Sequence, residues 1–133
     1  MSQIVLVDTS AWLAIYNQKD KYAREAAQFR KMHPTLLTTN FIIDEIITLV
    51  LNRAGYHAAV HTGEDLWSEK LAKIIYLTHA DELAAWELFK KYNDKKFSFT
   101  DCTSFVVMLR LGLTTAFTFD DDFVQTNLFR RAP

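Results

Sequence analysis

The sequence is poor in cysteine, glycine and proline, and each shortage argues against a class of protein. Its single cysteine, Cys102, excludes an internal disulfide and fits a reducing compartment. Only 3 Gly and 2 Pro leave little room for the many tight turns of an all-β chain. An all-β fold and a disulfide-stapled fold are therefore both disfavoured.

Long uncharged apolar runs are also missing. Asp8 stands where a secretory signal needs an uninterrupted apolar core, and the most apolar run, residues 41–51, carries Asp44 and Glu45. We therefore expect no membrane association and a cytoplasmic location. The formal net charge is only −1, so any binding to nucleic acid must come from a local patch rather than from bulk charge.

Core-forming residues, by contrast, are abundant. Half of the 133 residues are hydrophobic and 14% are aromatic, which is enough for a substantial core and excludes a disordered chain. We see no linker, internal repeat or low-complexity tract. Residues 1–133 are expected to form a single domain.

Apolar strands alternate with amphipathic helices along the chain. The first strand, 3–7, is a near-continuous run of branched apolar residues, which is typical of a central parallel strand. The alternation predicts an α/β fold, a three-layer α/β/α sandwich around a mainly parallel sheet. The expected strands are 3–7, 35–39, 73–78, 114–119 and a short edge strand at 128–131. The expected helices are 11–17, 20–32, 41–54, 56–72, 80–92 and 101–111, with Asn40 and Thr100 as caps of the third and the last.

Two acidic residues are placed by this pattern toward one edge of the sheet. Asp8 ends the first strand, and ligands of open α/β sheets bind at the carboxyl ends of the strands. Glu45 lies in a narrow polar stripe on an otherwise apolar helix, together with Asp44, Thr48 and Asn52. A carboxylate on such a buried helix is costly unless it is paired or holds a cation, and Glu45 is the more inward of the two acids.

Two further acids have competing explanations. Asp101 lies in the first turn of an apolar helix, where it either complements the helix dipole or serves a site. Asp120 follows the apolar strand 114–119, repeating the placement of Asp8, whereas Asp121 and Asp122 read as a solvated turn. Four converging carboxylates would repel one another unless hard divalent cations such as Mg²⁺ or Mn²⁺ neutralise them.

The chain resembles the PIN-domain ribonucleases and, among them, the VapC-type toxins of toxin–antitoxin pairs. The resemblance lies in four blocks that keep the family's order and spacing across essentially the whole chain: 7–10, 38–45, 97–102 and 116–123. It implies that the acidic site consists of Asp8, Glu45, Asp101 and Asp120. Asp122 also stands in a family-like position and is an alternative for the fourth acid. The resemblance assigns supporting hydroxyls to Thr9, Ser10 and Thr118.

The same resemblance implies an activity and partners. The expected activity is cleavage of RNA phosphodiester bonds that depends on Mg²⁺ or Mn²⁺, with an RNA substrate, a cognate antitoxin protein and a homodimeric state. The alternative is a catalytically silent PIN-like scaffold that binds RNA or a partner protein. Activity that survives the loss of Asp8 would argue against the metal mechanism.

Other candidate residues have plainer interpretations. Lys90, Lys91, Lys95 and Lys96 either hold RNA or form a solvated face, and Arg130 and Arg131 are similar. His57 and His61 have the i, i+4 spacing of a metal pair, but Ala58 replaces the glutamate of the zinc-protease motif, which favours surface histidines. Cys102 is expected to fill the core. Trp12, Leu13 and Tyr16 are core candidates, or line a groove for a partner helix.

Overall fold

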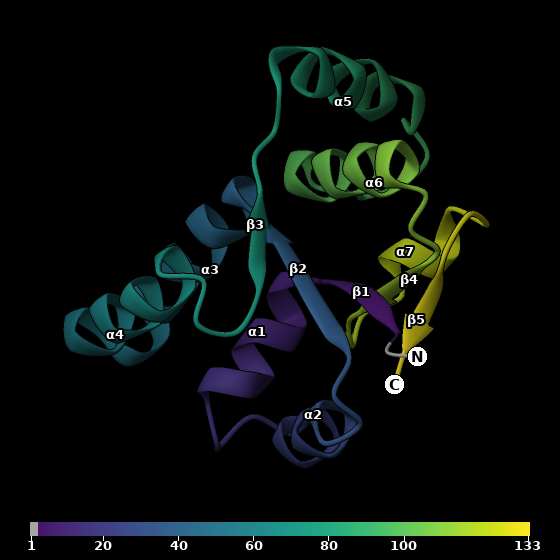
Figure 1. Ribbon diagram of the computed structural model, residues 1–133. Coiled ribbons are helices and arrows are strands. Elements are labelled where there is room, and N and C mark those ends of the chain that lie inside the picture. The colour runs from purple at the N-terminus through teal and green to yellow at the C-terminus, as the bar shows by residue number, and fades with distance from the viewer. Residues whose placement is uncertain (1–2) are drawn as a thin grey trace.

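The computed structural model describes residues 3–133 and is built on one parallel sheet (Figure 1). Its strands are β1 (Ile4–Val7), β2 (Thr35–Thr39), β3 (Lys73–Ile75), β4 (Thr115–Phe117) and β5 (Arg130–Ala132). Their order across the sheet is β3-β2-β1-β4-β5, and every neighbouring pair is parallel. The sheet is thus entirely parallel, with β1 at its centre as the sequence predicts.

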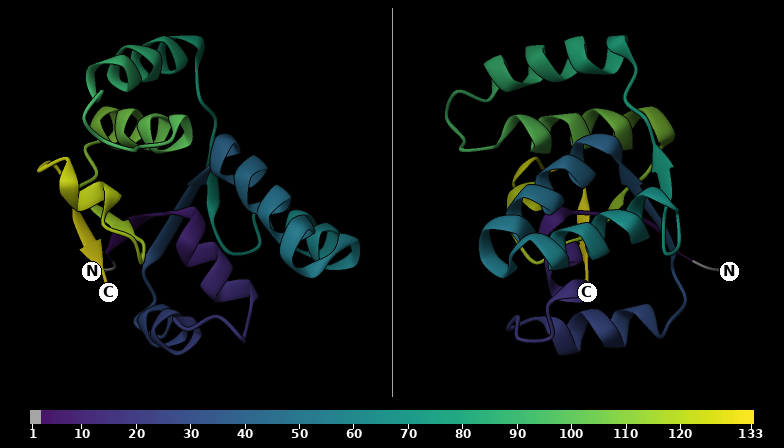
Figure 2. Two further views of the ribbon diagram at one scale, coloured as in Figure 1. Left: turned by 180° about the vertical axis from the view of Figure 1, so that it is seen from behind. Right: turned by 90° about the vertical axis from the view of Figure 1, so that its left-hand side faces the viewer.

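Helices connect the strands and cover both faces of the sheet. They are α1 (Thr9–Tyr16), α2 (Ala23–Arg30), α3 (Asn40–Ala54), α4 (Tyr56–Trp67), α5 (His79–Lys91), α6 (Phe99–Leu111) and the short α7 (Asp122–Gln125). Right-handed crossovers place α1 to α4 on one face and α5 to α7 on the other. Figures 1 and 2 show α3 and α4 as a projecting hairpin, and α5 as an outer layer on α6. The expected three-layer α/β/α sandwich is confirmed.

Several boundaries differ from the expected ones because a neighbouring hydroxyl takes the capping role. Thr39 rather than Asn40 caps α3, its hydroxyl accepting the Ile42 amide at 3.0 Å, while Asn40 accepts the Leu77 amide instead. Ser98 rather than Thr100 caps α6. The strands of the sheet are also shorter than their apolar runs: the third ends at Ile75 and the fourth at Phe117.

The core fills the space between the sheet and its two helix layers. The strand β1 contributes Val5, Leu6 and Val7, all fully buried. The largest side chain with no exposed surface is Trp12, whose indole donates to Thr38 Oγ1 at 3.1 Å. Trp12 therefore belongs to the core, whereas Leu13, also largely buried, borders a pocket of about 110 Å³ together with Tyr16.

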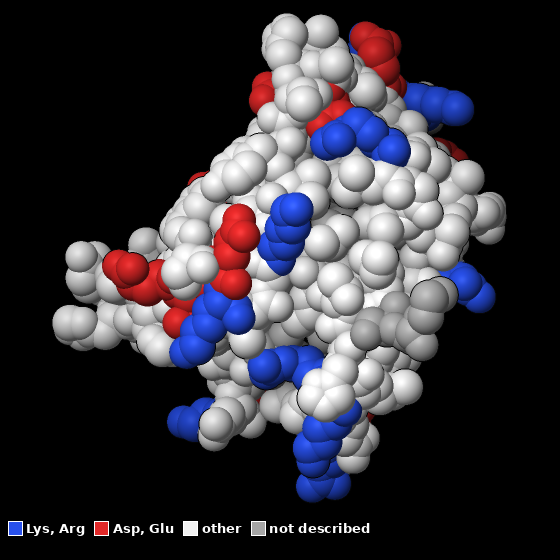
Figure 3. All heavy atoms as spheres, in the orientation of Figure 1, with Lys and Arg blue, Asp and Glu red and all other residues white. Residues whose placement is uncertain are grey.

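The surface carries charges of both signs. In the view of Figure 3, basic and acidic side chains are interspersed on a largely uncharged face. Over residues 3–133, no helix is long and apolar enough to cross a membrane.

Candidate active site

The candidate site lies at the carboxyl ends of β1 and β4, which are neighbours in the sheet. From β1 the chain proceeds to β2 on one side, whereas β4 lies on the other, so the strand order reverses between them. At such a switch point the connections diverge and leave a crevice, the usual ligand-binding place of open α/β sheets. Asp8 follows β1 directly, and Asp120 follows β4.

Asp8 is buried, with 4% of its surface exposed, and none of the ion pairs among residues 3–133 involves it. Its backbone carbonyl begins α1, but its carboxylate makes no capping bond and turns instead toward β4. There the Thr118 hydroxyl donates to Asp8 Oδ2 at 2.9 Å. Burial, with the nearby charge of Asp120, raises the pKa of Asp8 from 3.8 to about 7.

The two hydroxyls beside Asp8 form a small network that ties β1 to β4. Both hydroxyls lie within donating distance of Asp8 Oδ2, Thr118 at 2.9 Å and Ser10 at 3.4 Å, and their own oxygens lie 3.1 Å apart. Ser10 Oγ in turn accepts the Phe119 amide at 3.0 Å, and Thr118 accepts the Asp120 amide at 3.2 Å. The network therefore fixes Asp8 relative to Asp120.

Glu45 reaches the same crevice from α3. The Thr9 hydroxyl, at the start of α1, donates to Glu45 Oε1 at 2.5 Å. The negative charge of Glu45 acts on both Asp8 and Asp120, raising the pKa of each. Asp44, its neighbour in the polar stripe, is exposed. The helical stripe thus identified the inward acid of the pair.

Asp101 enters from the first turn of α6, where it completes a capping box with Ser98. Its carboxylate accepts the Ser98 amide at 3.0 Å, and the Ser98 hydroxyl accepts the Asp101 amide at 2.9 Å. Burial, the charges of Asp8 and Asp122 and a hydrogen bond with the Asp122 carboxyl raise its pKa to about 8. Asp101 therefore caps the helix and also belongs to the acid cluster.

This contact also places Asp122 in the cluster. Sequence analysis favoured a solvated turn for Asp121 and Asp122, and Asp121 is indeed exposed and paired with Arg131 at 3.0 Å. Asp122 is half-buried in the first turn of α7 and bonded to Asp101. The solvated-turn interpretation of Asp122 was wrong, because α7 turns its carboxylate back toward α6.

Asp120 supplies the clearest sign that a ligand belongs in the crevice. Its Oδ1 atom is buried and has no hydrogen-bond partner among residues 3–133. Burial and the charge of Asp122 raise the pKa of Asp120 above its ordinary value. An acceptor buried without a partner costs free energy, so an unsatisfied carboxylate oxygen beside four other acids calls for a cation.

The donor set fits a hard divalent cation. Every candidate ligand is a carboxylate or hydroxyl oxygen, the type that Mg²⁺ and Mn²⁺ prefer. Within residues 3–133 no three His, Cys, Asp or Glu side chains stand as a ready-made metal cage. Mg²⁺ usually keeps several of its waters, so it does not require a closed cage of protein ligands.

A hollow of about 330 Å³ opens beside Glu45. Its lining comes from the polar stripe of α3 and from the first turn of α6: Asp44, Glu45, Thr48, Leu49, Asn52 and Thr100. The stripe predicted from helical geometry therefore lines a hollow that includes Glu45, one acid of the cluster.

The other candidate residues lie outside the acid cluster. His57 is exposed, and His61 is exposed beside Asp65, at 3.7 Å. Cys102 is fully buried, and burial followed by the charge of Asp101 raises the pKa of its thiol to about 11, which keeps it un-ionised. Tyr16 is half-buried and donates to Asp65 at 3.2 Å.

Together, the parallel sheet and the acid cluster at its switch point define an open α/β protein with a carboxylate-lined crevice. Comparison with known proteins identifies the family within this fold class. The PIN-domain family matches residues 5–127. The 23S rRNA-specific endonuclease VapC20 from two strains of Mycobacterium tuberculosis is 33% identical over 124 residues, covering 90% of this chain and 92% of the relative.

Solved structures agree with this assignment. The crystal structure of M. tuberculosis VapC20, titled a sarcin–ricin loop cleaving toxin, superposes with a TM-score of 0.90 at 30% identity over 97% of this chain and 99% of that one. A DNA-bound VapBC from Salmonella typhimurium shares the fold at a TM-score of 0.69 and 12% identity, covering 98% and 97% of the two chains. The chain belongs to the PIN-domain family, among its VapC-type endonucleases.

Proposed function

We propose that this protein is the endoribonuclease toxin of a toxin–antitoxin pair and cleaves RNA with Mg²⁺ or Mn²⁺ at the acid cluster. The observation that carries the proposal is the group of buried carboxylates with raised pKa values around an unsatisfied oxygen of Asp120. Uncompensated charge of this kind destabilises a fold and is found at functional sites. Membership of the PIN-domain family gives the cluster its chemistry.

The carboxylates have distinct proposed roles. Asp8, Glu45 and Asp101 would form the primary metal shell, and Asp120, with Asp122 beside it, would hold a second ion or orient water. Bound divalent ions supply an activated water and offset charge developing on the phosphate. Water adds to phosphorus, the bond to the 3′ oxygen breaks and that oxygen takes a proton, which leaves a 5′-phosphate and a 3′-hydroxyl.

The hydroxyls of the site would keep these acids in place. Thr118 and Ser10 hold Asp8 against β4, and Thr9 holds Glu45, so each acid reaches the crevice in a fixed orientation. Preorganised charge of this kind needs no rearrangement as the reaction proceeds. We propose Thr9, Ser10 and Thr118 as positioning residues.

We propose large-subunit ribosomal RNA as the substrate. The support is the 33% identity, over 90% of this chain, to a relative whose name states specificity for 23S rRNA. A cytoplasmic location follows from that substrate.

We further propose an antitoxin partner and a homodimeric state. Apolar side chains on α3 and α4, four of them exposed, line a groove of about 330 Å³: Ile47, Leu51, Tyr56, Val60 and Trp67. Exposed apolar grooves of this kind suit an amphipathic helix of a partner protein.

The test compares the wild type with Asp8→Asn on total RNA containing ribosomal RNA, in Mg²⁺, in Mn²⁺ and in EDTA, with mapping of the ends produced. The control variant is Glu25→Gln, which neutralises an exposed acid on α2. We expect wild type and control to cut in either metal, leaving 5′-phosphate ends, and Asp8→Asn not to cut.

Two results would change the proposal. Cutting by folded Asp8→Asn, or by wild type in EDTA, would remove the metal mechanism. Metal binding without any cutting by the wild type would favour the silent scaffold.

A further inference from the structure

A polyanion has to approach this site against electrostatic repulsion. Five acidic side chains surround the crevice, and the net charge of the whole chain is −1. Neither the cluster nor the molecule as a whole therefore attracts RNA before the metal is bound. A productive complex needs cationic side chains and stacking surfaces next to the acids. These groups must contact the RNA on either side of the cleaved phosphodiester bond.

One groove in the structure combines both features. It has a volume of about 470 Å³ and lies between the end of α5 and the segment that leads into α6. Three lysines and four aromatic rings line it, together with Asn93: Lys90, Lys95, Lys96, Trp86, Phe89, Tyr92 and Phe97. Of the lysines, Lys90 pairs with Glu87 at 3.0 Å, whereas Lys95 and Lys96 take part in none of the ion pairs among residues 3–133.

The aromatic rings of the groove are available to a ligand. Trp86 is 47% exposed and Phe89 is 39% exposed, although both are large apolar side chains. Their rings stack on each other, with centroids 5.8 Å apart and planes inclined by 14°. Two nearly parallel, exposed rings beside free lysines are the elements with which proteins bind single-stranded nucleic acid.

Packed aromatic rings link the groove to the helices α3 and α6, which carry Glu45 and Asp101. The ring of Phe99, at the start of α6, lies 6.4 Å from Trp86 and 6.2 Å from Phe89. On its other side Phe99 contacts Phe41, in the first turn of α3, at 6.2 Å. Thr100, the next residue, lines the hollow beside Glu45. An aromatic path therefore joins the lysine groove to the mouth of the acid cluster.

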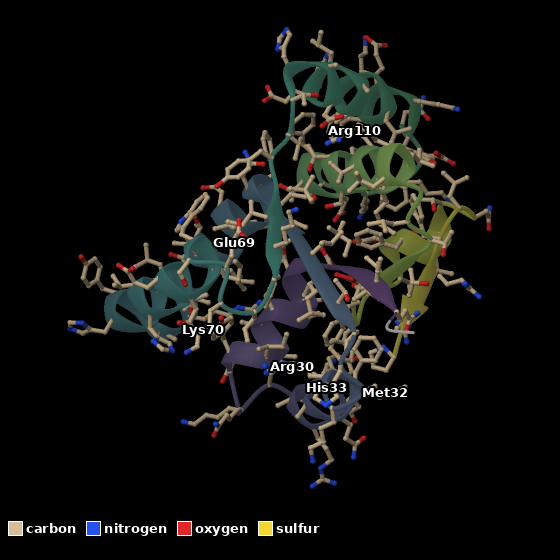
Figure 4. All side chains as sticks on the ribbon, in the orientation of Figure 1. Arg30, Met32, His33, Glu69, Lys70 and Arg110 are labelled. Atoms are coloured by element: carbon tan, nitrogen blue, oxygen red, sulfur yellow. The ribbon has the colours of Figure 1, made fainter. Side chains whose placement is uncertain are left out.

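The helix that carries these rings is held firmly. The guanidinium of Arg110, on α6, donates to both carboxylate oxygens of Asp81, on α5, at 2.9 and 2.8 Å. Figure 4 shows Arg110 between the two helices. This two-bond ion pair fixes α5 on α6, so Trp86 and Phe89 keep a constant position relative to Asp101.

From this geometry we infer that the α5–α6 groove binds the single-stranded RNA that flanks the cleaved phosphodiester, an inference that rests on the proposed ribonuclease function. Bases stack on Trp86 and Phe89, and Lys95 and Lys96 contact backbone phosphates. The sequence alone left this lysine cluster between RNA contact and solvated face. The aromatic lining, and the packing of its rings against the helices that carry the acids, favour RNA.

The test measures binding of a fluorescent twelve-nucleotide uridine RNA to the full chain in the Asp8→Asn background, without divalent metal. We expect Trp86→Ala to weaken binding at least about fivefold, the smallest loss usual for one stacked base, and Trp86→Phe to retain most of the affinity. Lys95→Ala with Lys96→Ala should weaken binding and flatten the salt dependence by about 1.4 logarithmic units per decade of salt, about 0.7 for each lost phosphate contact.

Two controls remove comparable groups elsewhere. Met32→Ala truncates a large exposed apolar side chain, 73% exposed, next to α2 and outside both proposed grooves. Lys19→Ala with Lys31→Ala removes two exposed lysines next to α2, at the opposite end of the molecule from α5 (Figures 1 and 2). Both controls should bind the RNA as the parent does. Equal losses in controls and groove variants would overturn the inference.

Sedimentation of the same variants tests the competing occupant. If Trp86→Ala converts a dimer to a monomer and leaves RNA affinity unchanged, α5 is a protein interface and the inference fails. RNA cleavage is then measured with the groove variants in which Asp8 is restored. This assay separates the proposed ribonuclease function from the proposed binding of RNA in the α5–α6 groove. Undiminished cutting of long RNA by the groove variants would refute the groove alone. Binding through the groove without cutting by the wild type would refute the nuclease alone.

Discussion

Two helices of this protein begin with the same capping box, and the aspartates at their third positions have opposite electrostatic surroundings. Thr78 and Asp81 cap α5, and Ser98 and Asp101 cap α6, each pair exchanging two hydrogen bonds. Both carboxylates are buried, with 4% and 9% of the residue exposed. Local sequence and burial therefore do not distinguish them.

The difference lies in what each carboxylate faces. Burial opposes the charge of Asp81, but hydrogen bonds from Arg110 and from the Thr78 amide outweigh it and hold its pKa below the ordinary value. Asp101 faces Asp8 and Asp122 instead, and its pKa rises to about 8. The Arg110 ion pair and the cap together compensate the charge of Asp81. The cap alone leaves the charge of Asp101 uncompensated, which identifies Asp101 as part of a site.

The largest expected contrast is in activity. Asp101→Asn should lower RNA cleavage by at least about a hundredfold, the lower end of what losing one preorganised charge at a reacting centre costs. Asp81→Asn should change the initial rate by less than about threefold at a temperature where both variants are folded. Comparable losses in the two variants would mean that both aspartates act only through the fold.

The next contrast is in stability, where the substitution of Asp81 should cause the larger loss. Asp81→Asn leaves a guanidinium without its carboxylate and should lower the free energy of unfolding by about 2 kcal/mol. Urea denaturation at pH 7 in EDTA measures this. Arg110→Lys keeps the charge but not the two-bond geometry and should lose about half as much. An unchanged midpoint for Asp81→Asn would show that the ion pair contributes nothing.

The smallest effect is a gain in stability, and it depends on pH. Because folding raises the pKa of Asp101, the folded state retains a proton that the unfolded chain releases between pH 3.8 and about 8. The metal-free wild type therefore loses stability as pH rises through this window. Asp101→Asn does not titrate and keeps an oxygen for the Ser98 amide, so we expect a gain of about 1 kcal/mol at pH 8.5 and none at pH 4. The stability difference between Glu25→Gln and the wild type should not change with pH. A gain for Asp101→Asn that is the same at pH 4 and pH 8.5 would contradict the raised pKa of Asp101.

The same comparison shows what could be predicted from the sequence. The strand ends that carry Asp8 and Asp120, and the polar stripe that carries Glu45, follow from periodicities of two and 3.6 residues, which are local. The cap of α6 was placed two residues late, because Ser98 and Thr100 are both good caps and only the backbone decides between them. Asp122 was misread because its contact with Asp101 is tertiary.

Two features had no signal along the chain. Asp81 and Arg110 are 29 residues apart, and nothing in their neighbourhoods links them. The aromatic path from Phe41 through Phe99 to Trp86 joins three helices, and only the spacing of Trp86 and Phe89, three residues apart, could have indicated a shared helix face. Both depend on how α5 packs on α6, which periodicity does not determine.

The most direct test of the central claim is a calorimetric titration of Mn²⁺ onto wild type, Asp101→Asn and Asp81→Asn at pH 7, in two buffers of different ionisation enthalpy. If the uncompensated acids form a metal centre, wild type and Asp81→Asn should bind Mn²⁺ equally and release more than one proton, since at this pH Asp101 is largely protonated and Asp8 about half protonated. Asp101→Asn should bind at least about tenfold more weakly and release fewer protons. Equal binding by Asp101→Asn, or no binding by the wild type, would contradict the account.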